Sequence, residues 1–420
     1  MRVLLISLDA LYSADFDLLR RLPHIGALIR GGISCDQVNT VYPAITYPAH
    51  VTLVTGVPPR IHGIPHNQPY DENGTDGLSA RSLTRSLKTG ADRDLCRPWY
   101  WDSADVKART LFDAVFEKGG RCASVLWPVT GKNPHIRYCF PEVSALPGES
   151  QMLKMLSYGS PGYVLWTELR LGKQRVSVQE PHLSDYATLL AEDLIRRRHM
   201  PDFTAVHLVD ADATRHEHGT HSPEAQAAIH RLDARVGRIM QALDKRGAWQ
   251  DTVLCLVSDH GQADITDSVS LSEALSQAGF HARAQSFGFG GAIRFSKEAE
   301  QEAQSVKRYL LDNRKALRLK AVYDARALEE MGAGEAYTLA VETEDGIVLS
   351  DCLADYKREK ATHGFSRTHP GAQCLWIMAG SGLPKGLQWP SADLTDVAPT
   401  LAALMNCALP EARGKNRISL

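Results

Sequence analysis

The chain opens with MRVLLISLDAL (residues 1–11), in which a short apolar run ends at an acid, Asp9. The run is too short for the apolar region of a signal peptide and far too short for a membrane span. It predicts a β-strand over residues 2–8 that starts almost at the first residue. Because the run is apolar on both faces, the strand is expected inside a sheet that is covered on both sides.

Other segments repeat this character along the chain. The similar runs are CASVLWP (122–128), FTAVHLV (203–209), TVLCLVS (252–258) and CLWIMAG (374–380). Between them, helical periodicity appears over residues 105–120, 185–199 and 222–247; the last begins with Ser222 and Pro223 and ends before Gly247, which are typical helix boundaries. This alternation predicts an α/β fold whose mostly parallel central sheet is flanked by helices on both faces.

Two regions interrupt the alternation. Residues 66–104 are polar and rich in turn residues, and they end in the aromatic run PWYWD. Residues 265–360 have a βαβ-like pattern of their own, which predicts an inserted α+β cap subdomain. The catalytic core is then expected to comprise residues 1–264 and 361–420, and the two interrupting regions are the expected determinants of specificity.

Composition limits the partners and the compartment. The formal net charge of the 420-residue chain is -2, so no overall basic field would attract a nucleic-acid polymer or an anionic membrane. No segment approaches the roughly 20 apolar residues of a spanning helix. The eight cysteines contain no CxxC pair and several lie in apolar runs, a pattern typical of buried thiols. We therefore expect a cytoplasmic protein.

Ionisable residues follow several of the predicted strands. Asp9 follows the first strand, Asp259 and His260 follow the strand at 252–258, and Asp212 lies just beyond the strand at 203–209. A single aspartate would say little, because aspartate is a common turn residue. Ligands of open α/β sheets, however, bind at the carboxyl ends of the strands. The sequence therefore predicts one shared site built from these side chains.

The stretch DADATRHEHGTH (residues 210–221) adds histidines to that site. Asp212 and His216 are four residues apart, so one helical turn places them on the same face, where both can reach one ion. Aspartate and histidine are common zinc ligands. For Asp210, His218 and His221 we expect solvent-exposed or supporting positions.

A candidate nucleophile lies in NTVYPAITYPAHVTLVTG (residues 39–56). Thr46 precedes a helical pattern, and a helix N-terminus favours an anion such as a phosphate or an alkoxide. On the residues alone, a plain N-cap role for Thr46 is an equally good interpretation.

Taken in order, these motifs resemble a known family. They are LDAL (8–11), TYPAHVTLVTG (46–56) with HGI (62–64), DATRHEHG (212–219), SDHG (258–261) and HGF (363–365). The chain resembles the alkaline phosphatase superfamily and, within it, the nucleotide pyrophosphatase/phosphodiesterase group. The resemblance extends to DVAPTLAALMNCALPEARGK (396–415) and thus covers nearly the whole chain.

The resemblance implies a pair of zinc ions, or other divalent metals, and a covalent mechanism. One ion would be held by Asp212, His216 and His363, and the other by Asp9, Thr46, Asp259 and His260. Thr46 would be the nucleophile that becomes phosphorylated. From the residues alone, His369 is as good a candidate as His363, and only the family pattern prefers His363.

Two positions after Thr46 bear on the substrate. The resemblance implies that Tyr47 stacks on a nucleoside base, although a packing role is an equal alternative. Ala49 replaces an asparagine that is usual in the group and that would donate to a phosphate oxygen, so another donor is required. The run Trp99–Tyr100–Trp101 forms either a pocket wall or an anchor for its loop.

The expected function is therefore a zinc-dependent phosphodiesterase or nucleotide pyrophosphatase that acts on small phosphoesters such as nucleotides. The alternatives are a phosphonate hydrolase or phosphomonoesterase of the same superfamily, and a metal-binding protein without turnover. A sulfatase is disfavoured, because the segment around Thr46 lacks the cysteine or serine followed by x-P-x-R that this branch needs.

Overall fold

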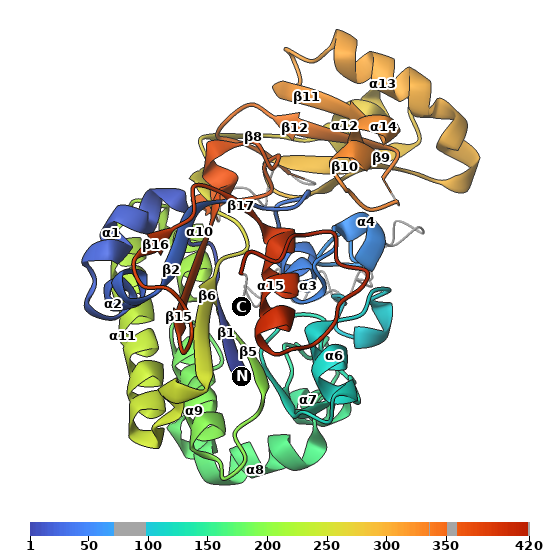
Figure 1. The fold of residues 1–420 in the computed structure, drawn as a ribbon. Helices are drawn as coiled ribbons and strands as arrows, with labels where there is room; N and C mark the ends of the chain where they lie inside the picture. Colours follow the sequence, from blue (N-terminus) through green and yellow to red (C-terminus); the bar gives the residue numbers. More distant parts are fainter. Residues whose placement is uncertain (71–97, 336, 351–358, 419–420) are drawn as a thin grey trace.

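A computed structural model describes residues 1–70, 98–335, 337–350 and 359–418 (Figure 1). Most of the turn-rich region at 66–104 lies outside the described residues. The centre of the fold is a nine-stranded sheet. Its strands in spatial order are β16 (Leu387–Gln388), β2 (Ile33–Asn39), β15 (Cys374–Gly380), β6 (Thr252–Val257), β1 (Arg2–Leu8), β5 (Phe203–Leu208), β3 (Cys122–Val125) and β4 (Ile136–Phe140), and β17 (Ala392–Asp393) also pairs with β2.

The first strand lies in the middle of this sheet. β1 pairs in parallel with β5 on one side and with β6 on the other, whereas β15 runs antiparallel to both of its neighbours β6 and β2. The prediction of a mostly parallel central sheet is confirmed. In a parallel sheet the carboxyl ends of neighbouring strands meet at one edge, so the residues after β1, β5 and β6 are brought together.

Helices cover both faces of the sheet. Leu4 and Ile6 of β1 belong to one buried apolar cluster, and the alternate residues Val3 and Leu5 belong to another. The first cluster includes residues of α2 (Pro23–Gly31), α9 (His182–Arg196) and α11 (Pro223–Arg246); the second includes residues of α3 (Thr46–Thr55), α6 (Leu111–Glu117) and α15 (Val397–Leu404). Burial of each large apolar side chain stabilises the fold by about 1.5–3 kcal/mol, and this double coverage explains why β1 is apolar throughout.

A smaller antiparallel sheet lies over the carboxyl edge of the central sheet (Figure 1). Its spatial order is β11 (Leu319–Asp324), β12 (Leu339–Thr343), β10 (Gly290–Phe295) and β9 (Ala282–Ser286). Residues of α12 (Leu271–Gln277) and α13 (Ala303–Asp312) complete its apolar core. We call residues 265–360 the cap. Where the chain leaves and re-enters the core, β7 (Ala263–Asp264) pairs with β14 (Ala361–Thr362). The division into two domains at these positions stays a prediction.

The described cysteines are free thiols. Five of the six are buried, and Cys407 is partly exposed. Cys96 and Cys352 lie outside the described residues. Among the helices of the described residues, none has both the length and the apolar character that crossing a bilayer requires.

Candidate metal and nucleophile site

The first group of candidate ligands, which we call the strand-end group, consists of Asp9, Asp259 and His260. Asp9 directly follows β1, and the other two lie just after β6. All three side chains are at most 1% exposed. His260 Nε2 lies 3.2 Å from Asp259 Oδ2 and 3.6 Å from Asp9 Oδ1. The parallel pairing of β1 with β6 therefore brings three potential metal ligands within 4.8 Å of one another.

Thr46 lies against this group. It is the first residue of α3, and Ile45 rather than Thr46 occupies the N-cap position. The N-cap position therefore has no side-chain capping hydrogen bond, and the Oγ1 of Thr46 lies 3.2 Å from His260 Nε2. The hydroxyl is thus placed beside a candidate metal ligand, at a helix terminus that favours negative charge.

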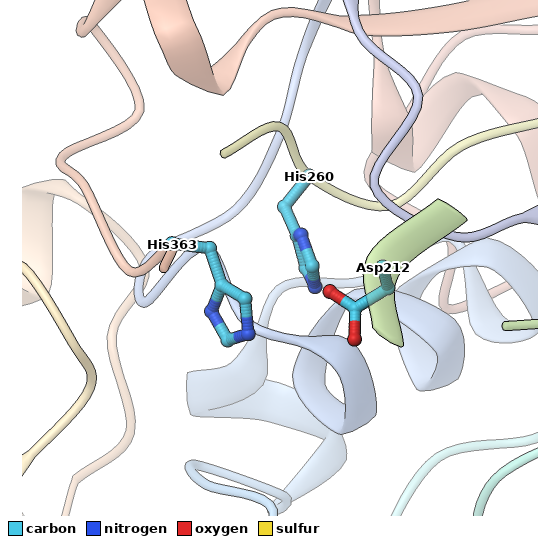
Figure 2. A group of neighbouring side chains, drawn as sticks. All are labelled: Asp212, His260 and His363. Carbon is cyan, nitrogen blue, oxygen red and sulfur yellow. The ribbon is translucent and has the colours of Figure 1, made fainter. Parts of the chain in front are cut away.

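The second group, which we call the helix–loop group, consists of Asp212, His216 and His363. Asp212 and His216 lie on α10 (Asp210–His218), with His216 Nε2 3.4 Å from Asp212 Oδ1, as their spacing predicts. His363 follows β14, and its ring centroid lies 4.0 Å from that of His260 and 5.2 Å from that of His216. Asp212, His260 and His363 offer ligand atoms within 4.8 Å of one another (Figure 2).

The seven residues predicted to form the site therefore converge, with two differences in grouping. His260, which the resemblance assigns to the strand-end ion, lies within reach of both groups, whereas His216 lies outside both 4.8 Å clusters and approaches them through Asp212. His218 and His221 are exposed, as expected. His369 lies elsewhere, with its Nε2 3.5 Å from Asp345 Oδ1.

The strand-end carboxylates are electrostatically unfavourable without a cation. Burial, together with the charges of Asp259 and Asp212, raises the pKa of Asp9 from 3.8 to about 8. Burial also raises the pKa of Asp259 from 3.8 to about 7, with a further contribution from Asp212. The ligand atoms of the two buried carboxylates lie within 4.8 Å of each other, so both can ionise at low cost only if a positive charge is supplied.

The histidines of the site favour their neutral form at two positions. Burial, then the proximity of His260, holds the pKa of His363 well below 6.5. Burial also lowers the pKa of His260. For Asp212, burial alone would raise the pKa, but the adjacent His216 outweighs it and holds the pKa well below 3.8. Burial alone would lower the pKa of His216, but the adjacent Asp212 outweighs it and holds the pKa well above 6.5. Because neutral imidazoles and ionised carboxylates are the forms that bind metals, His216 must give up its proton when a metal binds.

Several buried polar atoms of the site have no hydrogen-bond partner. They are Asp9 Oδ1, Asp259 Oδ2, His260 Nδ1 and His363 Nδ1. Buried polar atoms in native proteins are nearly always satisfied by protein, water or an ion. Because the side chains are carboxylates and imidazoles, the donor set fits zinc or a similar divalent cation.

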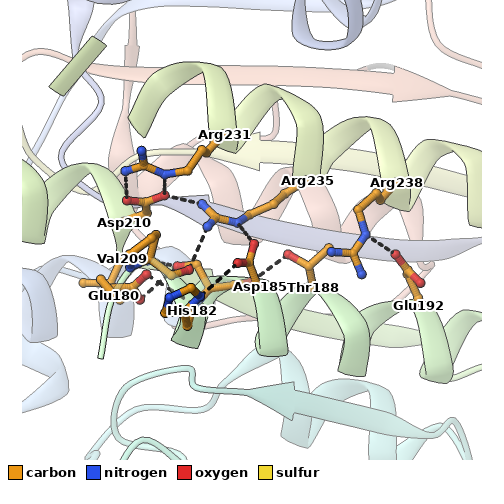
Figure 3. A network of polar contacts seen from close by, with 12 residues as sticks. Glu180, His182, Asp185, Thr188, Glu192, Val209, Asp210, Arg231, Arg235 and Arg238 are labelled. Atoms are coloured by element: carbon orange, nitrogen blue, oxygen red, sulfur yellow. Dashed lines mark hydrogen bonds and ion pairs between the residues drawn. The ribbon is translucent and has the colours of Figure 1, made fainter. Parts of the chain in front are cut away.

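A buried ionic network holds α10 in place (Figure 3). Asp210 is fully buried and accepts hydrogen bonds from Arg231 Nε at 2.8 Å and from Arg231 Nη2 at 2.6 Å, and it also pairs with Arg235. Arg235 Nε in turn donates to Asp185 of α9 at 2.9 Å. The start of α10 is thereby attached to α11 and α9, and this attachment fixes the helix that carries Asp212 and His216.

Three supporting side chains were not anticipated from the sequence. His207 of β5 lies with its Nε2 2.7 Å from Asp9 Oδ2. Gln262 Nε2 donates to Asp212 Oδ1 at 2.6 Å. His50 lies with its Nδ1 2.8 Å from the carbonyl oxygen of Thr46 and 3.5 Å from Asp259 Oδ2. Two of them had a signal in the sequence: His207 is a histidine inside an apolar strand, and Gln262 is a polar residue two positions after His260.

An amide group does lie near Thr46, but it comes from Asn67. Its Oδ1 accepts a hydrogen bond from the backbone N–H of Tyr47 at 2.9 Å, so the side chain lies at the N-terminus of α3. The side chain of Tyr47 is 1% exposed, and Trp99 packs edge to face against it with centroids 5.1 Å apart. A base could therefore stack on Tyr47 only if the protein opened around that ring, and the stacking role stays a prediction.

Comparison with known proteins shows which family the chain belongs to. The family model for type I phosphodiesterase / nucleotide pyrophosphatase matches residues 3–366. Venom phosphodiesterase 2 of Crotalus adamanteus is 24% identical over 272 residues, which are 63% of this chain and 27% of the relative. Human ectonucleotide pyrophosphatase/phosphodiesterase family member 1 is 26% identical over 245 residues, 57% of this chain and 21% of the relative. The chain thus spans about a quarter of the length of these curated relatives.

Solved structures extend the likeness to the whole fold. Murine ectonucleotide pyrophosphatase/phosphodiesterase 5, as an inactive threonine-to-alanine variant in complex with AMP, superposes with a TM-score of 0.73 at 18% identity, covering 99% of this chain and 97% of that one. Human ectonucleotide pyrophosphatase/phosphodiesterase 5 superposes with a TM-score of 0.71 at 19% identity, covering 99% of this chain and 97% of that one. With the family model matching most of its length, the chain belongs to the type I phosphodiesterase / nucleotide pyrophosphatase family and has the alkaline phosphatase-like fold.

Proposed function

We propose that this protein hydrolyses phosphodiester or phosphoanhydride bonds of small molecules, nucleotides among them, through a phosphothreonine intermediate on Thr46. The observation that carries the proposal is the position of Thr46 Oγ1, 3.2 Å from His260 Nε2, which lies within reach of both ligand groups. The inactive relative that holds AMP carries a threonine-to-alanine change, which supports a threonine nucleophile and a nucleotide substrate.

Two divalent cations, with zinc as the best fit, are the proposed cofactors. The strand-end group with Thr46 would hold one and the helix–loop group the other. When bound, such ions neutralise phosphate charge and lower the pKa of a nearby hydroxyl.

The chain's own groups account for the chemical steps. Thr46 Oγ1 gives up its proton and attacks phosphorus while the bond between phosphorus and the leaving oxygen breaks. The leaving oxygen takes up a proton from solvent, and the first product departs. Water then cleaves the phosphothreonine, which releases the second product and restores the hydroxyl. His50 anchors the Thr46 carbonyl at the start of α3 and thereby fixes the approach of the nucleophile.

Asn67 is the proposed replacement for the donor missing at Ala49. Its amide oxygen is engaged by the Tyr47 N–H, which orients the side chain beside Thr46. We propose that its NH2 group donates to a non-bridging phosphate oxygen. Replacing Asn67 by alanine is expected to lower kcat about 10²- to 10³-fold with little change in zinc content, as for other single donors to a developing oxyanion. An unchanged kcat would remove Asn67 from this role.

The substrate class is tested with chromogenic esters. Bis-p-nitrophenyl phosphate should be hydrolysed faster than p-nitrophenyl phosphate and p-nitrophenyl phenylphosphonate. A large preference for the monoester or the phosphonate would replace the diesterase assignment by one of the alternatives drawn from the sequence.

The nucleophile is tested by Thr46→Ala with Thr46→Ser as the matched control. The alanine variant should lose turnover and form no phosphoprotein while retaining most of its zinc, whereas serine should keep measurable activity because it retains a hydroxyl. Turnover by the alanine variant at the wild-type rate would show that another group attacks phosphorus.

A further inference from the structure

The hairpin turn between β9 and β10, which we call the cap turn, consists of Phe287, Gly288 and Phe289. It closes with a hydrogen bond from the Phe287 N–H to the Gly290 carbonyl at 2.7 Å. Both phenylalanines are buried, at 4% and 1% exposure. A hairpin turn normally lies at the surface with polar residues; this one instead inserts two aromatic rings into the junction between cap and core.

One side of the cap turn holds the segment that carries His363. The N–H of Phe289 donates to the carbonyl oxygen of His363 at 2.9 Å. The rings of Phe289 and Phe365 are stacked, with centroids 4.7 Å apart and an interplanar angle of 13°. The backbone of a candidate metal ligand is therefore fixed by the cap rather than by the central sheet.

Two glycines make this approach possible. Gly288 has φ +106°, and a Cβ there would lie 2.3 Å from the His363 carbonyl oxygen. Gly364 has φ +89°, and a Cβ there would lie 2.0 Å from the Phe287 carbonyl oxygen. Both positions have left-handed backbone and leave no room for a side chain. The two glycines therefore allow the cap turn and the segment that carries His363 to pack backbone against backbone.

The other side of the cap turn contacts the segment that leads to Thr46. The ring of Phe287 lies edge to face with Tyr42 at 6.0 Å and belongs to the same apolar cluster as Ile45. The segment that carries His363 also contacts this stretch directly, because the N–H of Gly364 donates to the carbonyl oxygen of Ala44 at 3.1 Å. One turn of the cap thus touches the flanks of both the nucleophile and a metal ligand.

We propose that the cap turn is the positioning element for His363, so that docking of the cap and metal binding in the helix–loop group are thermodynamically linked. A well-docked cap turn strengthens metal binding by fixing His363, and by the same coupling the bound metal stabilises the docked cap. The inference rests on the metal centre of the proposed function but not on turnover.

The test is zinc binding by Gly288→Ala, measured by competition with a chelator and by metal analysis. We expect the zinc site of the helix–loop group to lose affinity by about 10- to 100-fold, which is the usual effect of disturbing the residues that support a metal ligand, while the site of the strand-end group is unchanged. The matched control is Gly279→Ala in the same cap, because Gly279 also has a positive φ, +82°, but has no atom within 4 Å of an added Cβ. The control should bind zinc as the wild type does.

A second variant and a second readout separate positioning from misfolding. Phe289→Leu removes the stacking on Phe365 while retaining an apolar side chain, and it should weaken the same zinc site by a smaller factor. Addition of zinc should slow hydrogen exchange at the Phe289 amide in the wild type and much less so in Gly288→Ala.

The outcomes distinguish this inference from the proposed function. If the wild type binds two zinc ions and cleaves the diester while Gly288→Ala binds zinc with wild-type affinity at both sites, only the role of the cap turn is overturned. If the wild type binds no zinc, the proposed metal centre and the inference both fail.

Discussion

The two ligand groups of the site are held in different ways. The strand-end group is attached to the ends of β1 and β6 in the middle of the sheet, and its side chains are at most 1% exposed. In the helix–loop group, the side chains of Asp212 and His216 are 14% and 21% exposed. That group depends on a helix fixed by Asp210 and on a loop fixed by the cap turn. The strand-end group is therefore held by the sheet itself, whereas the helix–loop group is more exposed and is held by contacts outside the sheet.

The largest expected effect follows from this contrast. Asp9→Ala should lower kcat/KM by at least about 10³-fold at any zinc concentration, because a metal ion contributes several kcal/mol of transition-state stabilisation. His216→Ala, in the more exposed group, should lose activity at low zinc and regain part of it with added zinc. Steady-state assays across a range of zinc concentrations measure this rescue, and equal rescue of both variants would show that the two groups do not differ in this way.

The support of α10 gives the next effect. Asp210→Asn removes one of the two carboxylates that pair with buried Arg235, the other being Asp185, and removal of one partner of a buried pair costs up to about 3–5 kcal/mol. Urea unfolding should show this loss, together with weaker zinc binding. The matched control is Glu330→Gln, which removes an exposed pair with Arg326 and should change stability by no more than about 0.5 kcal/mol. Wild-type stability of the Asp210 variant would contradict the assigned role of the network.

Each group has a neighbouring side chain that orients one of its carboxylates, so the two groups can be perturbed separately. His207→Phe removes the contact to Asp9, and Gln262→Leu removes the hydrogen bond to Asp212. Each variant is expected to weaken zinc binding about 10-fold, at its own group only. Competition titrations that resolve two affinities would measure this. If both variants weaken the same site, the two groups are not independent.

The smallest expected effect is a dependence of metal-free stability on pH. In the folded protein the pKa of Asp9 is raised from 3.8 to about 8 and that of Asp259 from 3.8 to about 7. An acid whose pKa is raised on folding holds its proton more tightly in the folded state, so stability falls as pH rises towards the folded pKa. From these two groups, the melting temperature of chelated protein should therefore fall as the pH rises from about 4 to about 8, and the fall should level off above about pH 8. With zinc bound the decline should be much smaller, and an equal decline with and without zinc would contradict the account.

The sequence alone predicts the strand-end group better than the helix–loop group. Asp9, Asp259 and His260 follow from strands that are apolar on both faces, because parallel strands end at a common edge. Asp212 and His216 follow from helical spacing. His363 could be selected over His369 only through the family resemblance, since a loop position has no periodicity from which to derive its neighbours.

What sequence reasoning missed are contacts between segments distant in the chain. His207 contacts Asp9 across the sheet, and Asn67 reaches the start of α3 from a loop that follows the helix. β2 and β4 were not predicted either, because they lie towards the edges of the sheet and carry polar residues such as Asp36 and Arg137. The cap turn was not predicted either, because the role of its glycine and its two phenylalanines depends on their contacts with residues 363–365, which are distant in the sequence.

The most direct test of the account is a crystal structure of the zinc-loaded protein with anomalous scattering measured at the zinc absorption edge. The account predicts a pair of zinc peaks, one beside Asp9, Asp259 and the hydroxyl of Thr46, and the other beside Asp212, His216 and His363. Absence of zinc from both positions, or a Thr46 side chain turned away from the metals, would contradict it.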